Sequence, residues 1–335
     1  MRRSAAFALA ALILFSALTA CSSGEKTAEF FAMDTYMSVK AYGGGDAVDE
    51  AEALVFELER KLSITDGLSE ISAVNEAGSA QVSQETAELV ASALGLCELS
   101  GGALDISVYP VTRAWGFTAG EYRVPQEAEL EKLLRLVDYT KVTVSGDTVS
   151  LGEGMLIDLG AVAKGYAGDR VTELLRSHGV KSAIINLGGN VQCLGRKPDG
   201  SRWKIGVQDP AGSGYVGVIE AEDEAVITSG GYERFFVEDG KTYWHIIDPS
   251  DGRPADSGLL SVTVVGKSGL ACDGLSTALF VMGAEKAAAL WRENGGFEAV
   301  FVTENGDIII TEGLSGRFTT SGGRKVSEVI RRDEN

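Results

Sequence analysis

The chain of 335 residues contains only two histidines, and His245 lies in the stretch YWHIIDPSDGRPA at 243–255. Aromatic residues precede it, and a turn rich in Asp, Pro and Gly follows. An imidazole at the edge of a turn can act as a general base near neutral pH. A structural histidine bonded to backbone is the alternative that this stretch alone leaves open.

A carboxylate and a hydroxyl are spaced four residues apart in ACDGLSTALFVMG, at 271–283. In a helix, Asp273 and Thr277 would share one face. Magnesium typically takes one or two carboxylates and fills its remaining positions with water and substrate phosphates. The pair therefore suits an Mg²⁺ site, although a helix-capping aspartate and a core threonine would fit the spacing equally well.

Two glycine-containing motifs add possible anion and close-approach sites. In IDLGAVAKGYAGD (157–169) an expected strand ends at Asp158, and Lys164 follows in the first turns of a helix. Helix N-terminal N–H groups and a nearby lysine favour an anion, although the order of a Walker A loop is absent. The alternative is a solvated lysine on an ordinary strand–turn–helix. The paired glycines of INLGGNV (185–191) allow a backbone or a ligand to come close.

The stretch TSGGYERFF (228–236) precedes the histidine motif and is predicted as its partner strand. Its aromatic residues are expected in the strand core, and Arg234 is a candidate phosphate contact. Taken together, the motifs indicate a metal-assisted phosphate site with one imidazole. Such a site would carry out phosphoryl or nucleotidyl transfer, or pyrophosphate hydrolysis.

Helical and strand periodicities alternate irregularly along the chain, which favours an α+β fold over a strict βαβ order. We expect a single large domain of mostly antiparallel sheets flanked by helices. Predicted helices cover 46–62, 83–99, 125–137, 161–178, 273–282 and 284–293. Predicted strands cover 30–41, 141–144, 148–151, 155–159, 183–187, 299–302 and 307–311. The SEIS segment is expected as a polar loop, and 319–335 as a loose polar tail.

The first 20 residues read as a signal peptide, with two arginines before an apolar run. Small residues before Cys21 resemble a bacterial lipobox, so Cys21 is expected to carry the lipid, and 21–29 to begin the mature chain as a tether. A plain transmembrane anchor is the alternative. The expected location is the cell membrane, lipid-anchored on its extracytoplasmic side.

The net charge of the whole chain is −18, and an acidic surface argues against a nucleic-acid partner. The remaining cysteines are not spaced as a C-x-x-C pair and are expected as buried thiols. The local field of a pocket can differ from the global charge, so a nucleotide cofactor remains compatible with this composition.

Eight ordered stretches together resemble the FAD:protein FMN transferases of the ApbE family. Besides the motifs above, they include MDT (33–35), SEISAVN (69–75) and GGALDISVYPV with WGF (101–117). The resemblance runs from about Phe30 to Gly313 and implies a catalytic domain over 30–318. It also implies an Mg²⁺-dependent reaction in which FAD is cleaved, FMN passes to a Thr or Ser hydroxyl of an acceptor protein, and AMP leaves. The implied acceptor is a subunit of a membrane redox complex or an FMN-binding domain.

The resemblance also implies roles for individual residues. His245 matches the proposed general base, and the implied magnesium ligands are the carbonyl of Ala161 with Asp273 and Thr277. The implied flavin-nucleotide contacts are Met33, Ala103, Leu104, Asp105, Asp158, Lys164 and Ile246.

Two positions depart from the family pattern. Asp34 replaces a glycine, and Thr65 stands at the flavin-contact position where many members carry an aromatic residue. Loss of a stacking face costs on the order of 1 kcal/mol and would loosen FAD. The departures keep two alternatives open, an Mg²⁺-dependent FAD pyrophosphatase and a flavin-binding lipoprotein.

Overall fold

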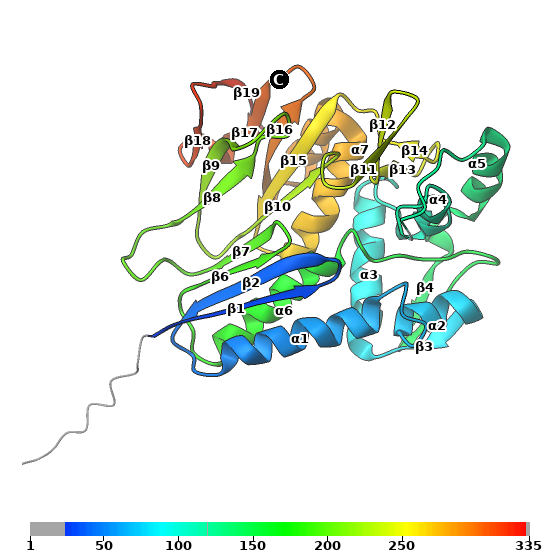
Figure 1. Cartoon of the computed structure of the whole chain (residues 1–335), viewed down its shortest axis with the longest axis horizontal. Coiled ribbons are helices and arrows are strands. Elements are labelled where there is room, and N and C mark those ends of the chain that lie inside the picture. The colour runs from blue at the N-terminus through cyan, green and yellow to red at the C-terminus, as the bar shows by residue number, and fades with distance from the viewer. Residues whose placement is uncertain (1–23, 119, 333–335) are drawn as a thin grey trace, which may run out of the picture.

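A nine-stranded sheet forms the centre of the computed structural model, which describes residues 24–118 and 120–332 (Figure 1). Neighbouring strands are antiparallel except for the last pair, β17 and β19. In spatial order the strands are β1 (Glu25–Ala32), β2 (Thr35–Tyr42), β6 (Ala183–Leu187), β7 (Asn190–Leu194), β10 (Ala225–Gly230), β15 (Leu259–Gly266), β16 (Phe297–Thr303), β17 (Ile308–Thr311) and β19 (Val326–Ile330).

Helices cover one face of this sheet, and a second small sheet covers the other. Alternation along β16 shows the two layers, because Ala299 and Phe301 face the helical core while Val300 and Val302 join the second cluster. That cluster also holds apolar residues of β8 (Trp203–Gln208), β9 (Tyr215–Ala221) and β18 (Phe318–Thr320).

The helices are α1 (Ala47–Leu62), α2 (Glu70–Ala77), α3 (Gln84–Leu99), α4 (Tyr109–Ala114), α5 (Glu127–Leu133), α6 (Ala163–Ser177) and α7 (Gly269–Asn294). The remaining short strands are β3 (Ser79–Gln81), β4 (Thr143–Ser145), β5 (Thr148–Ser150), β11 (Phe235–Glu238), β12 (Lys241–Trp244), β13 (Ile247–Asp248) and β14 (Arg253–Pro254). In the described residues, no helix is long and apolar enough to cross a bilayer. The predicted α+β class with mostly antiparallel sheets is confirmed.

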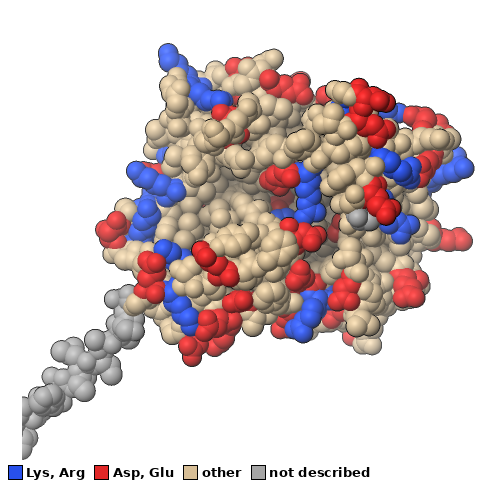
Figure 2. Space-filling view, viewed as in Figure 1, with Lys and Arg blue, Asp and Glu red and all other residues tan. Residues whose placement is uncertain are grey.

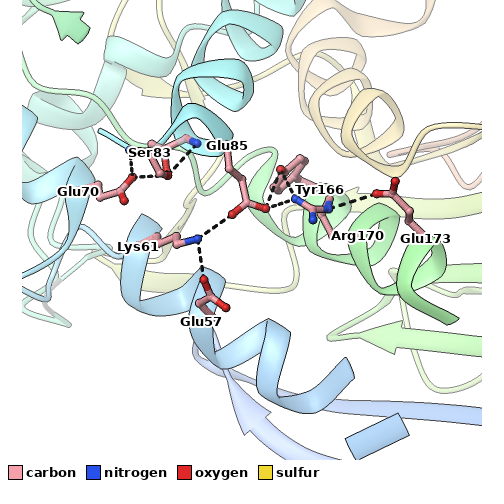
Figure 3. A network of polar contacts seen from close by, with 9 residues as sticks. Glu57, Lys61, Glu70, Ser83, Glu85, Tyr166, Arg170 and Glu173 are labelled. Atoms are coloured by element: carbon pink, nitrogen blue, oxygen red, sulfur yellow. Dashed lines mark hydrogen bonds and ion pairs between the residues drawn. The ribbon is translucent and has the colours of Figure 1, made fainter. Parts of the chain in front are cut away.

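Half-buried ion pairs fix α6 against α1 and α3 (Figure 3). The carboxylate of Glu85 on α3 binds Lys61 of α1 at 2.8 Å and also pairs with Arg170 of α6. The hydroxyl of Tyr166 donates to the same carboxylate at 3.1 Å. Removing one partner of such a network leaves a charge poorly solvated, so the three helices are held as one unit.

Several sequence predictions are corrected near the N-terminus. The single strand expected over 30–41 is a hairpin of β1 and β2, and Met33 and Asp34 turn the chain with φ values of 47° and 58°. Strand β1 already begins at Glu25, within the expected tether. The polar loop expected at SEIS is largely helix α2, capped by the side chain of Ser69. The expected signal peptide and Cys21 lie outside the described residues.

Other corrections concern the middle and the end of the chain. Residues 155–159 form no strand, because Asn75 bonds both the N–H and the carbonyl of Ile157 from its side chain. The loose tail expected over 319–335 is wrong where β18 and β19 pair with β9 and β17. The expected break between two helices at Gly283 is confirmed as a kink within α7, with φ 76°.

Candidate active site

Titratable side chains from four other segments gather around Lys164, in the first turn of α6. The ammonium group of Lys164 interacts electrostatically with Asp158, Glu233, His245 and Asp273. Figure 2 shows one face of the molecule, which is hollowed near its centre and carries acidic and basic side chains at the rim of the hollow. The structure thus brings together four of the residues singled out in the sequence, and adds Glu233.

Helix α7 presents Asp273 and Thr277 at the base of this group. The carboxylate of Asp273 is buried and accepts a hydrogen bond from the N–H of Gly165 at 2.8 Å. Burial raises the pKa of Asp273, while the charge of Lys164, the Gly165 N–H and the Asn190 amide oppose that rise. The hydroxyl of Thr277 lies 3.2 Å from that of Ser229 on β10.

The donor set of this region fits a magnesium ion with few protein ligands. In the described part of the chain, no three His, Cys, Asp or Glu side chains are grouped to hold a metal. A single buried carboxylate with a neighbouring hydroxyl matches the sparing coordination of Mg²⁺. A cation would also offset the cost of ionising Asp273 in a buried position. Buried Asn190 places its side-chain amide beside that carboxylate as a further polar group.

Asp158 forms hydrogen bonds that hold the turn before α6. Asp158 accepts a hydrogen bond from the N–H of Gly160 at 2.8 Å and donates its own N–H to the carbonyl of Ile106 at 2.9 Å. Burial raises the pKa of Asp158, and the charges of Lys164 and Arg234 oppose the rise. Ala161 lies in the same turn, half-buried against the main core.

His245 follows β12 and is held by the chain segment before β11. Its Nδ1 lies 3.2 Å from the carbonyl oxygen of Arg234, and its backbone N–H donates to the same oxygen at 3.0 Å. Burial lowers the pKa of His245 to about 4. Because a carbonyl only accepts, the Nδ1–H donates and Nε2 keeps its lone pair. His245 is therefore neutral at pH 7 and able to accept a proton.

A cluster of aromatic side chains lies beside His245. It contains residues from the WGF motif as well as from β11 and β12. We use the name aromatic ribbon for strands β11 and β12 together with Trp115, Phe117 and Tyr122. The ring of Phe236 stacks on those of Tyr122 and Tyr243 with centroids 5.3 and 5.2 Å apart. Phe117 packs its edge toward His245 at 6.4 Å. Phe236 is half-buried as expected of a core residue, but Phe235 is 49% exposed, which corrects that expectation.

Glu233 is a site residue that the sequence reasoning missed. Its side chain is accessible, yet surrounding protein atoms desolvate the carboxylate and raise the pKa to about 7, with Asp273 adding to the rise and Lys164 opposing it. Its position in the TSGGYERFF motif, beside Arg234 and upstream of His245, was the available signal.

The remaining expected flavin contacts lie in two places. The side chain of Leu104 is buried close to Gly274 of α7, and neighbouring Asp105 accepts hydrogen bonds from Ser107 and the N–H of Tyr139. The side chain of Asp105 thus shapes its own loop. Ala103 lies half-buried before them, and Ile246 is buried in the core beside His245.

Met33 and Thr65 lie nearer to α1. The N–H of Met33 donates to Glu59 at 2.6 Å, and the hydroxyl of Thr65 lies 3.1 Å from that of Ser63. The turn at Met33 also adjoins a glycine motif, because a Cβ on Gly188 would meet Thr35 at 2.3 Å. The MDT and INLGGN motifs therefore touch one another at Gly188. This contact lies two residues before Asn190 in the sequence.

The comparisons with known proteins converge on one family. The model described as "ApbE family" matches residues 33–301. A protein named FAD:protein FMN transferase from Treponema pallidum (strain Nichols) is 35% identical over 84% of each chain. Another so named, from Klebsiella pneumoniae (strain 342), is 33% identical over 86% of this chain and 92% of its own.

Solved structures agree with the sequence relatives. The ApbE protein of Thermotoga maritima superposes with a TM-score of 0.83 at 32% identity, covering 88% of this chain and 99% of that one. The flavin transferase ApbE of Vibrio cholerae gives a TM-score of 0.78 at 29% identity, covering 88% of this chain and 100% of its own.

Proposed function

Because this chain belongs to the ApbE family, we propose that it transfers FMN from FAD to a Thr or Ser hydroxyl of an acceptor protein and releases AMP. The observation that carries the proposal is the position of His245. A neutral imidazole held by a backbone carbonyl lies in the same charged group as Lys164 and Asp273. This arrangement joins a proton acceptor to a site suited to phosphate charge.

His245 would take the proton of the acceptor hydroxyl through Nε2 as the oxygen attacks the phosphorus of the FMN half. A hydroxyl is a weak nucleophile at neutral pH, so a positioned base contributes directly to the rate. Lys164 would bind the diphosphate and balance the charge that develops on the AMP leaving group. The bond between the FMN phosphorus and the bridging oxygen breaks, and AMP carries that oxygen away.

Asp273, Thr277 and the carbonyl of Ala161 would hold Mg²⁺. A bound Mg²⁺ supplies Lewis-acid stabilisation of the diphosphate oxygens. The buried carboxylate of Asp273 supports this assignment, as described above.

We further propose that the chain acts while anchored by lipid on Cys21 at the extracytoplasmic side of the cell membrane. The signal-like run and the small residues before Cys21 support this location. The acceptor would then be a subunit of a membrane redox complex or an FMN-binding domain exposed on the same side.

The experiment incubates the full chain in detergent with FAD and a candidate acceptor domain, with MgCl₂ or with a chelator. Mass spectrometry follows the acceptor, and chromatography follows AMP. The proposal predicts one FMN added per acceptor site and equal AMP, only with MgCl₂. Intact FAD under all conditions would contradict it.

One observation favours FAD hydrolysis as a second activity of the same site. Thr65 is exposed, and the loop around it (63–69) contains no aromatic side chain that could stack on the flavin. A loosely held flavin gives water more opportunity to compete with the acceptor. Free FMN and AMP in the absence of an acceptor would reveal this activity.

A further inference from the structure

Helices α6 and α7 exchange hydrogen bonds reciprocally at their N-termini. The N–H of Gly165 on α6 donates to Asp273 of α7 at 2.8 Å, and the N–H of Gly269 on α7 donates to Asp169 of α6 at 2.6 Å. In each helix the aspartate lies four residues after the glycine, in GYAGD and GLACD. We call this arrangement the helix crossing.

The crossing leaves no room for a side chain at either glycine. A Cβ on Gly165 would lie 2.2 Å from the carbonyl oxygen of Gly269, and a Cβ on Gly269 would lie 1.7 Å from Nε2 of Gln192. Gln192 is itself buried and donates to the carbonyl of Gly165 at 2.9 Å. Backbone contact of this kind fixes the position of one helix on the other.

Asp169 makes further hydrogen bonds to the first turn of α7, besides the one from Gly269. Its carboxylate also accepts from the N–H of Leu270 at 3.0 Å and from the hydroxyl of Ser268 at 3.1 Å. A carboxylate at a helix N-terminus pairs the otherwise unpaired N–H groups and complements the helix dipole. The first turn so fixed leads directly to Asp273, and Thr277 follows one turn later.

We propose that Asp169 is a positioning residue for the magnesium site: by holding the start of α7 on α6, it fixes Asp273 and Thr277 relative to Lys164. This inference rests on the proposed function, because it takes Asp273 and Thr277 as the metal ligands. Asp169 touches neither metal nor substrate. It acts through the reciprocal pair of glycine contacts.

The test titrates MgCl₂ into the full chain in detergent, with saturating ADP as a probe that shares the adenosine diphosphate part of FAD. The midpoint temperature of thermal unfolding is measured, because an ion that binds only the folded state raises that temperature. In Asp169→Asn the half-saturating MgCl₂ concentration should rise ~10-fold or more, as for other residues that orient metal ligands. Asp199→Asn is the matched control, with unchanged MgCl₂ dependence, because Asp199 also accepts a backbone N–H and a serine hydroxyl, both from Ser201, but lies in the exposed loop before β8.

Two further variants separate positioning from charge and from simple misfolding. Asp169→Glu keeps the charge but moves the carboxylate, so it should weaken the MgCl₂ response as well. Gln192→Met removes the hydrogen bond to Gly165 while keeping a similar volume, and it should also weaken the MgCl₂ response. It is the variant to use if Asp169→Asn does not fold.

An Asp169→Asn protein with a lower unfolding midpoint but the wild-type MgCl₂ dependence would overturn the positioning role. A weakened response in Asp169→Asn with a normal one in Asp169→Glu would also overturn it, in favour of charge alone. A wild-type chain with no response to MgCl₂ would instead contradict the proposed magnesium site itself.

Discussion

The helix crossing and the aromatic ribbon place the two halves of the proposed chemistry on very different supports. In the crossing, backbone N–H groups of α6 and α7 bind the carboxylates of Asp273 and Asp169, and glycines leave no space for a methyl group. The ribbon has four residue pairs between β11 and β12 and exposes Phe235 and Val237. The comparison teaches that the residues proposed to bind the diphosphate are fixed by backbone contacts, whereas the proposed base, His245, follows a small, partly exposed element.

This difference suits the two substrates. A flexible diphosphate loses less affinity to misplacement when its binding groups are held on a rigid support such as the crossing. In the proposed mechanism the acceptor is a protein that approaches His245 from solvent, beside an element with exposed apolar side chains. Trp244 anchors the end of the ribbon to α7, because its ring packs against Phe280 with centroids 6.2 Å apart and its Nε1–H donates to Ala255. The base is therefore positioned even though the rest of the ribbon is lightly attached.

The largest expected effect is on the ribbon side. His245→Ala should lower the rate of acceptor modification by ~10²–10⁴-fold, the usual contribution of a positioned general base. Mass spectrometry of the acceptor measures the rate. His178→Ala is the matched control, since the other histidine ends α6 at the surface beside Glu50. A full rate in His245→Ala would remove the base from the account.

The crossing is tested by adding one methyl group. Gly165→Ala places a Cβ 2.2 Å from a carbonyl oxygen and should lower the free energy of unfolding by ~1–3 kcal/mol. Gly95→Ala on α3 has open space around its Cβ and should instead raise it by ~0.5–1 kcal/mol. Urea unfolding compares the two variants. Equal stability of both would show that the crossing is not tightly packed.

A smaller effect is expected where the flavin lacks a stacking partner. Thr65→Tyr should gain on the order of 1 kcal/mol of stacking and tighten FAD binding roughly fivefold. The ratio of acceptor modification to free FMN should rise with it. Quenching of flavin fluorescence gives the affinity, and Thr65→Val serves as a control without an aromatic ring. Unchanged affinity in Thr65→Tyr would place this loop away from the flavin.

Sequence reasoning located most of the helices and strands. It was wrong about several of the segments that connect them. The helices around Val55, Leu89 and Leu175 follow apolar periodicity, and their predicted ranges agree with α1, α3 and α6. The hairpin turn at Met33 was missed because two non-glycine residues adopt positive φ there. Residues 155–159 look like a strand, but Asn75 binds them from far along the chain.

The site divides in the same way. Motif spacing found His245, Lys164 and Asp273, which are brought together by tertiary contacts between α6, α7 and the ribbon. It missed Glu233, although Glu233 stands within a motif that was singled out, and it gave no indication of the role proposed for Asp169. Their environment depends on helices and loops that meet only in the folded chain.

A further prediction concerns the pH dependence of stability, which Glu233 and His245 control on either side of the ribbon. The folded-state pKa of Glu233 is raised from 4.5 to about 7, so its contribution to stability is present below pH 4.5 and is lost as pH rises through 7. The pKa of His245 is lowered from 6.5 to about 4, so its contribution is present above pH 6.5 and is lost as pH falls toward 4. Relative to Glu233→Gln, the metal-free wild type should lose stability between pH 4.5 and 8. Thermal unfolding across this range measures the difference, and parallel pH profiles would contradict it.

The division of labour between crossing and ribbon is tested most directly by measuring FAD binding and acceptor modification in His245→Ala and Asp273→Asn side by side, with MgCl₂ present. The account predicts that His245→Ala binds FAD like the wild type and leaves the acceptor unmodified. It predicts that Asp273→Asn loses the MgCl₂-dependent part of FAD binding together with modification. Loss of FAD binding in His245→Ala, with normal MgCl₂-dependent binding in Asp273→Asn, would contradict it.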